Sequence, residues 1–331
     1  MLSISVTYAD VTLFGTIDQA YSKSEYSTTA GTLVNKTTIA GVQNGDSGIG
    51  FKGDEDLGNG LKASFLHELG VSTQGAAATS VRQAFVALGG GFGQVRIGKQ
   101  YSQAFMNTVS VDPMGATGVN GHNSYIVLLS GGGDAPLRQQ NAVQYSLPAF
   151  VDGLGITLTK TYGGENTVGG TATDGMGAAI MYSSGALYAG FTWDKTANTG
   201  VTATLPNATT LTLVAASTTT DRDLKTLSAS YDLGMAKIGF NNVKASVGSN
   251  NLDNTAFTVG IPVGSAVIGL STSAGNLKNN GADTKHTGYQ LGLDYNLSKR
   301  TVAYAQMGAT KLDNTLQQRL SSSAFGIRHS F

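Results

Sequence analysis

The sequence predicts an all-β protein, a single antiparallel barrel of about sixteen strands that spans a membrane. Three observations predict this fold class. Apolar and polar residues alternate strictly along many segments, and short connections alternate with long ones. The composition is rich in glycine, with 45 residues, and poor in proline, with 5, which suits many strands joined by tight turns.

The composition also excludes several classes of protein. Charged residues make up 13% of the chain and the formal net charge is zero, which is unlike a nucleic-acid binder. The chain has no cysteine, so disulfides, cysteine nucleophiles and thiolate metal sites are absent. No run approaches about 18 consecutive apolar residues, so we expect no membrane-spanning helix. A closed barrel is the other structure that pairs every backbone polar group inside a bilayer.

The first nine residues stand apart from the pattern. The segment MLSISVTYA lacks a basic beginning and is too short for a complete signal peptide. Two interpretations stay open, an arbitrary leader and the remnant of a signal peptide. We therefore assign residues 1–9 to a leader or signal remnant and residues 10–331 to a single barrel domain.

The alternation is the primary evidence for strands. Between residues 186 and 194, for example, Leu187, Phe191 and Trp193 alternate with small or polar residues. Period-two alternation over such a length is typical of a strand with one apolar and one wet face. The same pattern occurs at 11–18, 47–53, 94–98, 288–294 and 324–331.

The connections between these runs are of two kinds. Short ones are expected near 54–60, 89–93, 148–154, 183–185, 232–235, 262–264 and 296–299. Longer stretches of Gly, Ser, Thr and Asn are expected as loops near 23–45, 69–80, 101–140, 163–175, 196–222, 247–254, 274–285 and 311–320. Short turns on one rim and long loops on the other are typical of bacterial outer-membrane barrels.

A soluble β-sandwich or β-solenoid is the alternative fold. Such a protein buries its alternating apolar face against a second sheet and presents many Lys and Glu to solvent. Here the polar partners are mostly Gly, Ser, Thr and Gln, and the two-rim arrangement of connections also favours the barrel.

Six strings in the right order resemble the general porins of Gram-negative bacteria, in particular the β-proteobacterial type. They are spread over nearly the whole length of the chain: DVTLFGTID, GIGFKGDEDLGNGLKASFLHE, RQAFVALGGGFGQVRIGKQY, NAVQYSLPAF, YNLSKRTVAYAQMG and the C-terminal SAFGIRHSF. The resemblance implies a homotrimer in the outer membrane, in contact with lipopolysaccharide and lipid. It also implies that the third extracellular loop, about 101–140, folds into the lumen, and that Phe331 is an assembly signal. An external loop is the alternative for 101–140, and a terminal aromatic also fits a lipid-facing girdle.

The resemblance further implies a basic cluster on the wall opposite that loop. Parity is ambiguous for the strand of Arg82, and the resemblance places this side chain in the lumen. Parity groups Arg138 with Ala142 and Gln144 on the lumen side, because a charge on the lipid face would cost about 2–4 kcal/mol. We therefore expect these pore-constriction residues: Arg82, Arg138, Asp112, Asp134, Arg96 and Lys52.

One departure bears on selectivity. The resembling pattern often has Arg where this chain has Gly48, so one member of the basic cluster is missing. Basic rings favour anions and acidic rings favour cations. Asp112 and Asp134 are expected to offset Arg82 and Arg138, and the expected preference for anions is weak.

The predicted function is a water-filled channel for passive diffusion of ions and small hydrophilic solutes, with no cofactor, no metal and no nucleic-acid partner. None of the four histidines, His67, His122, His286 and His329, lies in a zinc-protease motif, and no Gly-x-Ser-x-Gly elbow is present. The chain is therefore not expected to be an enzyme. A substrate-specific channel and an outer-membrane barrel enzyme remain as alternatives.

Overall fold

The computed structural model describes most of the chain after residue 9. The described residues are 10–27, 32–42, 47–73, 80–115, 137–163, 174–197, 203–205, 209–211, 221–279, 282–313 and 319–331. Every structural statement below concerns these residues.

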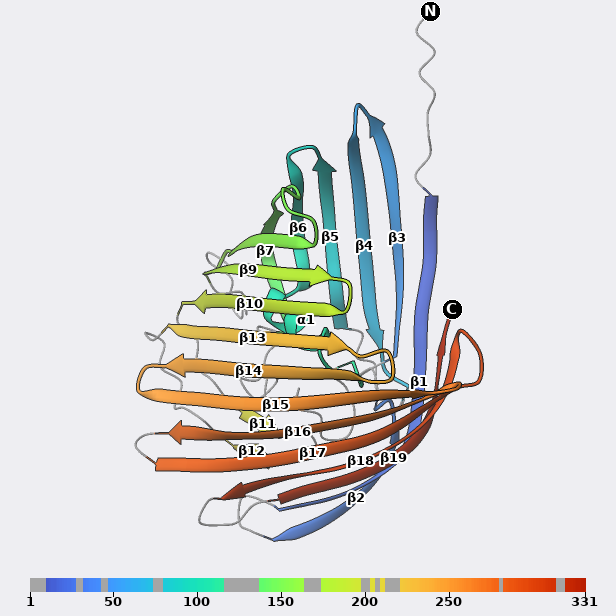
Figure 1. Ribbon diagram of the computed structural model, residues 1–331, viewed down its shortest axis with the longest axis vertical. Coiled ribbons are helices and arrows are strands. Elements are labelled where there is room, and N and C mark those ends of the chain that lie inside the picture. Colours follow the sequence, from blue (N-terminus) through green and yellow to red (C-terminus); the bar gives the residue numbers. More distant parts are fainter. Residues whose placement is uncertain are drawn as a thin grey trace, which may run out of the picture.

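The wall of the molecule is one antiparallel sheet whose strands follow each other round a ring (Figure 1). Its first half contains β1 (Asp10–Ser27), β2 (Leu33–Ala40), β3 (Ser47–Gly58), β4 (Leu61–Val71), β5 (Ser80–Gly90), β6 (Gly93–Tyr101), β7 (Arg138–Ser146), β8 (Leu154–Thr161), β9 (Gly175–Ser184) and β10 (Leu187–Thr196). Its second half contains β13 (Arg222–Asp232), β14 (Lys237–Val247), β15 (Asn250–Val263), β16 (Ala266–Asn279), β17 (Ala282–Asn296), β18 (Thr301–Asp313) and β19 (Arg319–Ser330). A separate hairpin consists of β11 (Ala203–Leu205) and β12 (Thr209–Leu211).

The sheet closes through β1, which has neighbours along both edges. On one edge it pairs with β19, from Thr16 opposite Ser330 to Tyr26 opposite Leu320. On the other edge its first part pairs with β3 and its second part with β2, so β2 and β3 share one strand position. The described strands thus form a closed barrel of 16 positions, which confirms the predicted fold class.

The two faces of the wall differ in polarity as the alternation predicts. Outward-facing apolar side chains are exposed, including Ile97, Phe257 and Phe325, which is 62% exposed. Inward-facing side chains such as Thr192 and Gln290 are polar and fully buried inside the barrel. A continuous apolar outer face is what a barrel presents to lipid, whereas a soluble sandwich would bury it.

Some predicted loops are strands. The prediction of long loops at 247–254 and 274–285 is wrong, because β14 and β15 are joined through Gly248 and Ser249 alone, and β16 and β17 cover most of the second segment. Gly248 has φ +58°, which a tight reversal requires. The predicted loop at 23–45 likewise contains the end of β1 and all of β2. Inward-facing residues of a barrel are polar, so these strands have a loop-like composition.

The described residues contain one helix in addition to the strands, α1 (Gln103–Val109), which the alternation does not predict. In that part of the chain no helix is long and apolar enough to cross a membrane.

The C-terminal residue is held by β1. The backbone N–H of Phe331 donates to the carbonyl of Gly15, and the N–H of Gly15 donates to the carbonyl of Phe331, both with N···O distances of 3.0 Å. The Phe331 ring lies so close to Gly15 that a Cβ at this position would overlap it. The role of Phe331 as an assembly signal stays a prediction, but the structure shows why position 15 has no side chain.

We expect Gly15→Val to weaken closure of the barrel by about 1–3 kcal/mol, because the added side chain displaces the Phe331 ring. The measurement is the temperature at which the folded, fast-migrating band converts to the unfolded band in gel electrophoresis. Gly91→Ala is the matched control, since a Cβ there meets no atom within 4 Å. Equal conversion temperatures for the two variants would show that this contact does not support closure.

Candidate functional site

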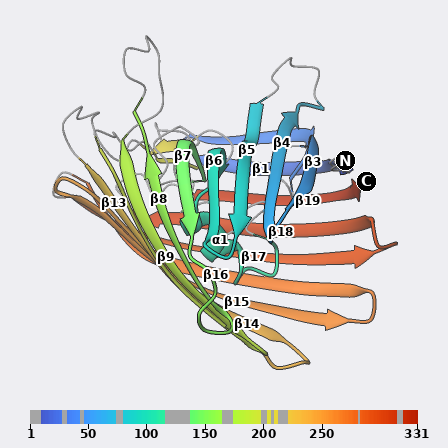
Figure 2. The same ribbon diagram turned by 90° about the horizontal axis from the view of Figure 1, so that it is seen from above.

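A short helix enters the lumen directly after β6. Ser102 caps α1, with its Oγ accepting a hydrogen bond from the N–H of Phe105 at 3.1 Å. Figure 2 shows α1 inside the ring of strands, and its neighbours on the wall are β9, β10 and β13. The described part of the 101–140 connection therefore folds inward, as the resemblance implies.

Asn107 attaches α1 to the wall. This side chain is fully buried. Its Nδ2 donates to Oγ1 of Thr226 at 2.7 Å, and its Oδ1 accepts from the hydroxyl of Tyr188 at 2.8 Å. Buried amides that satisfy both ends fix a segment strongly, because breaking the bonds leaves unpaired polar groups.

A row of glycines seats the next part of the loop. One glycine on each of β14 to β17 faces residues 111–114, and a Cβ at any of the four would overlap the backbone or a side chain of this segment. The glycines are Gly239, Gly260, Gly269 and Gly292. Residues 102–115 thus run along the inner wall from β6 to β17, and they narrow the lumen.

A basic cluster lies on the wall near the start of this loop. Arg82 Nε lies 3.0 Å from Oε1 of Glu68, in an ion pair whose side chains are 9% and 16% exposed. Arg82 Nη2 also donates to the hydroxyl of Tyr101 at 3.2 Å. The guanidinium of Arg138 lies over the Tyr101 ring, 5.2 Å from its centroid. Gln83 completes the cluster by donating to Oε2 of Glu68 at 3.0 Å.

A bulge directs Arg82 into the lumen. Even parity would place Arg82 on the outer face with Val86 and Leu88, which are 61% and 42% exposed. The register between β4 and β5 shifts between Glu68 and Leu69, and Arg82 falls between two ladder pairs. Bulges re-aim side chains in this way.

A second bulge affects Arg138. The register between β6 and β7 shifts between Gly98 and Gln100, and Asn141 has φ +48°. The period-two alternation that groups Arg138 with Ala142 and Gln144 in the sequence is therefore interrupted between them. Arg138 joins the cluster because it pairs with Tyr101.

Gly48 faces the same cluster. A Cβ at this position would lie 3.7 Å from Oε1 of Glu68 and 3.8 Å from Cδ of Arg82. An arginine here, as in the resembling pattern, would be a third cation. Its absence leaves two guanidinium groups and one carboxylate.

The acidic residues expected on the loop have other surroundings. Asp112 is 7% exposed and its Oδ1 accepts from the N–H of Met114 at 2.9 Å. It lies in the segment seated on β14 to β17, across the barrel from Arg82. Asp134 lies outside the described residues.

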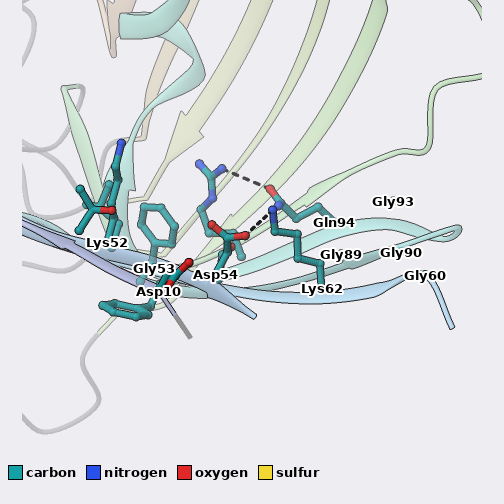
Figure 3. A pocket seen from close by; sticks show the side chains of 16 residues that line it. Asp10, Lys52, Gly53, Asp54, Gly60, Lys62, Gly89, Gly90, Gly93 and Gln94 are labelled. Carbon is teal, nitrogen blue, oxygen red and sulfur yellow. Dashed lines mark hydrogen bonds and ion pairs between the residues drawn. The ribbon is translucent and has the colours of Figure 1, made fainter. Parts of the chain in front are cut away.

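Lys52 and Arg96 lie nearer the rim of the short turns. Both line a cavity of about 670 Å³ beside β3 to β6 (Figure 3). Arg96 on β6 pairs with Ala87 on β5, which lies five residues along that strand from Arg82. Five residues of strand correspond to about 17 Å. The five predicted residues that the structure describes therefore do not form one ring.

Two sets of charged residues in the lumen are not among the six that the sequence predicts. Glu68 is not among the predicted residues, because its role as the ion-pair partner of Arg82 follows only from the adjacency of β4 and β5. The second set contains Asp194, which is 5% exposed and accepts from Nε2 of Gln139 at 2.9 Å. Arg222, 3% exposed, donates to Oγ1 of Thr196 at 3.1 Å. In the sequence, the only indication of this inward position is that Asp194 falls on the polar side of the alternating segment 186–194.

No cluster of three or more His, Asp or Glu that could hold a metal ion occurs in the described ranges. A polar lumen, a loop that narrows it and a buried basic cluster define a channel.

The chain belongs to the Gram-negative porin family, whose model matches residues 3–315. This membership places the protein in the outer membrane and points to a channel rather than an enzyme. Among curated proteins, the major outer membrane protein P.IB of Neisseria meningitidis is 44% identical over 93 residues, and the match spans 28% of each chain. Among solved structures, an anion-selective porin from Comamonas acidovorans matches with a TM-score of 0.81 and 24% identity over 98% of this chain and 100% of that one. OmpT of Vibrio cholerae in its trimer form matches with a TM-score of 0.70 and 13% identity over 98% and 100%.

We expect Asn107→Ala to loosen α1, because Thr226 and Tyr188 lose a buried partner at a cost of about 1–3 kcal/mol. The measurable result is a larger and noisier single-channel conductance. Met106→Ala, at an exposed position of the same helix, is the control. Unchanged conductance in a correctly folded Asn107→Ala barrel would mean that this bond does not set the width of the pore.

Proposed function

We propose that the protein is a passive channel for ions and small hydrophilic solutes, with a weak preference for anions. The observation that carries this proposal is the course of residues 102–115, which begin near the cluster of Arg82, Glu68 and Arg138 and run along the polar inner wall to β17. A closed barrel of 16 strands leaves an aqueous channel that such a loop narrows.

The charges of the cluster explain why the preference is weak. Basic groups lining a pore favour anions. Glu68 lies 3.0 Å from Arg82 and balances its charge, so that the cluster carries a net charge of +1. A unit charge about 7 Å from a passing ion, screened at physiological ionic strength, contributes about 0.25 kcal/mol, favourable for an anion and unfavourable for a cation. The difference of about 0.5 kcal/mol corresponds to roughly a twofold to threefold difference between their occupancies.

The proposed assembly is a homotrimer surrounded by lipid and lipopolysaccharide. The exposed apolar outer face supports contact with lipid, and the similarity to a porin solved in a trimer form supports the stoichiometry. Single-channel recording in a planar bilayer tests the whole proposal. Ohmic steps that close in threes are expected, and a folded barrel that passes no ions would favour an enzyme or an anchor instead.

The double variant Arg82→Ala with Arg138→Ala should move the reversal potential in a salt gradient toward cation preference. Glu68 then remains as the unbalanced charge of the cluster, and the anion-to-cation permeability ratio should fall by roughly twofold to threefold per charge removed. An unshifted reversal potential would sink the assignment of these residues.

Glu68→Gln should act in the opposite direction. Removing the carboxylate leaves two guanidinium groups, and the permeability ratio should rise by roughly twofold to threefold. Glu25→Gln is the matched control, because Glu25 pairs with Arg319 at the outer surface, 3.0 Å away. If the two variants give the same reversal potential, Glu68 does not moderate selectivity.

A further inference from the structure

Three large apolar side chains, Phe65, Leu66 and Phe85, line the wet cavity near the short turns, and two of them face each other. Leu66 on β4 and Phe85 on β5 are directly opposite each other in the ladder, and both line the cavity of about 670 Å³. Both are partly exposed, whereas apolar lumenal side chains such as Leu224 and Val243 are only 1% exposed. A water-filled lumen is polar, so a partly exposed apolar pair is a departure that transport of inorganic ions does not require.

A cation lies on each side of this pair. Lys52 on β3 is opposite Leu66 in the ladder, and its ammonium lies 5.6 Å from the centroid of the Phe14 ring. On the other side, the guanidinium of Arg96 lies 4.5 Å from the centroid of the Phe85 ring. The wall therefore presents cation, apolar pair and cation in sequence across four strands.

Arg96 is held in place and retains hydrogen-bonding capacity. Its Nη2 donates to Oε1 of Gln94 at 3.2 Å, and its ring contact with Phe85 fixes the plane of the guanidinium. Its Nε is buried, so the Nη groups are the donors that a solute in the cavity can reach. A planar carboxylate is the acceptor that a guanidinium with open donors binds best.

The cavity also contains two acidic residues, and Asp54 lies at the same level of the ladder as Arg96, through Ser64 and Ala87. Asp54 forms an ion pair with Lys62 at 2.6 Å, and Asp10 is opposite Asp54 in the ladder. Figure 3 shows the Asp54–Lys62 pair on one side of the cavity and Lys52 on the other. This distribution disfavours a multiply charged anion and is compatible with a single carboxylate near Lys52 or Arg96.

We propose that this wall is a binding site for organic monocarboxylates with an aromatic or branched aliphatic body. The body packs on Leu66 and Phe85, and the carboxylate accepts hydrogen bonds from Arg96 or from Lys52. Because the site is open to the lumen, binding is weak, on the order of 1 mM, which permits release and transit. The inference rests on the proposed channel function and names a class of solute for it.

Benzoate is the probe, titrated against the full-length barrel in a planar bilayer with chloride as the carrier ion. The expected result is a saturable reduction of chloride current by benzoate, with acetate at least tenfold weaker because it lacks the apolar body. Benzylammonium, which has the ring and the opposite charge, should not block at this site.

Variants separate the two halves of the site. Leu66→Thr with Phe85→Thr should weaken the benzoate effect by about tenfold and leave the weak acetate effect as it is. Phe85→Leu retains an apolar surface and should retain benzoate binding, which guards against a mere folding defect.

Arg96→Gln should weaken the effects of benzoate and acetate alike. Arg328→Gln is the charge control, since Arg328 lies on β19 and is 4.0 Å from Asp294.

Equal effects of benzoate and acetate, or unchanged benzoate binding in the double threonine variant, would overturn the inference. In either case a persisting chloride current would leave the channel function intact. A native barrel without chloride current would instead reject the channel function itself.

Discussion

The structure depends on one constraint, that every backbone N–H and C=O inside a bilayer must find a partner within the protein. The long strand β1 meets this constraint by pairing with β19 on one edge and with β2 and β3 on the other. The exchange of two hydrogen bonds between Gly15 and Phe331 extends the pairing to the last residue of the chain. Closure without a free edge then creates the lumen.

A closed wall also dictates how a loop can lie inside it. The strands of the wall pair their backbone groups chiefly with each other, so side chains and shape must hold residues 102–115. Asn107, Thr258 and Lys237 supply hydrogen bonds, and the glycine row on β14 to β17 supplies the room. Part of the high glycine content therefore serves the fit between loop and wall, in addition to the turns.

Bulges place the charges that face the pore. Strict alternation would have left Arg82 on the lipid face, and the shift in register at Glu68 brings it inward to an anionic partner. The same wall carries Lys52, Leu66, Phe85 and Arg96 nearer the short turns, where regular alternation is kept. The lumen thus has a nearly balanced basic cluster at one level and an amphipathic surface at another, so charge and apolar contact act on a solute at different places.

The sequence by itself determined the barrel, because period-two alternation such as that around Phe191 reports directly on two unlike faces. It pointed to Arg82 through resemblance and to Arg138 through parity, and the part of both in selectivity stays a prediction. It misplaced the strands around 247–254 and 274–285, because polar lumenal residues have the composition of loops. Tertiary structure alone decided which side chains meet. Arg82 and Glu68 become partners through strand pairing and a bulge, and Asp112 is drawn to the opposite wall by the glycine row. Such contacts depend on register between distant segments, and no local pattern in the chain encodes it.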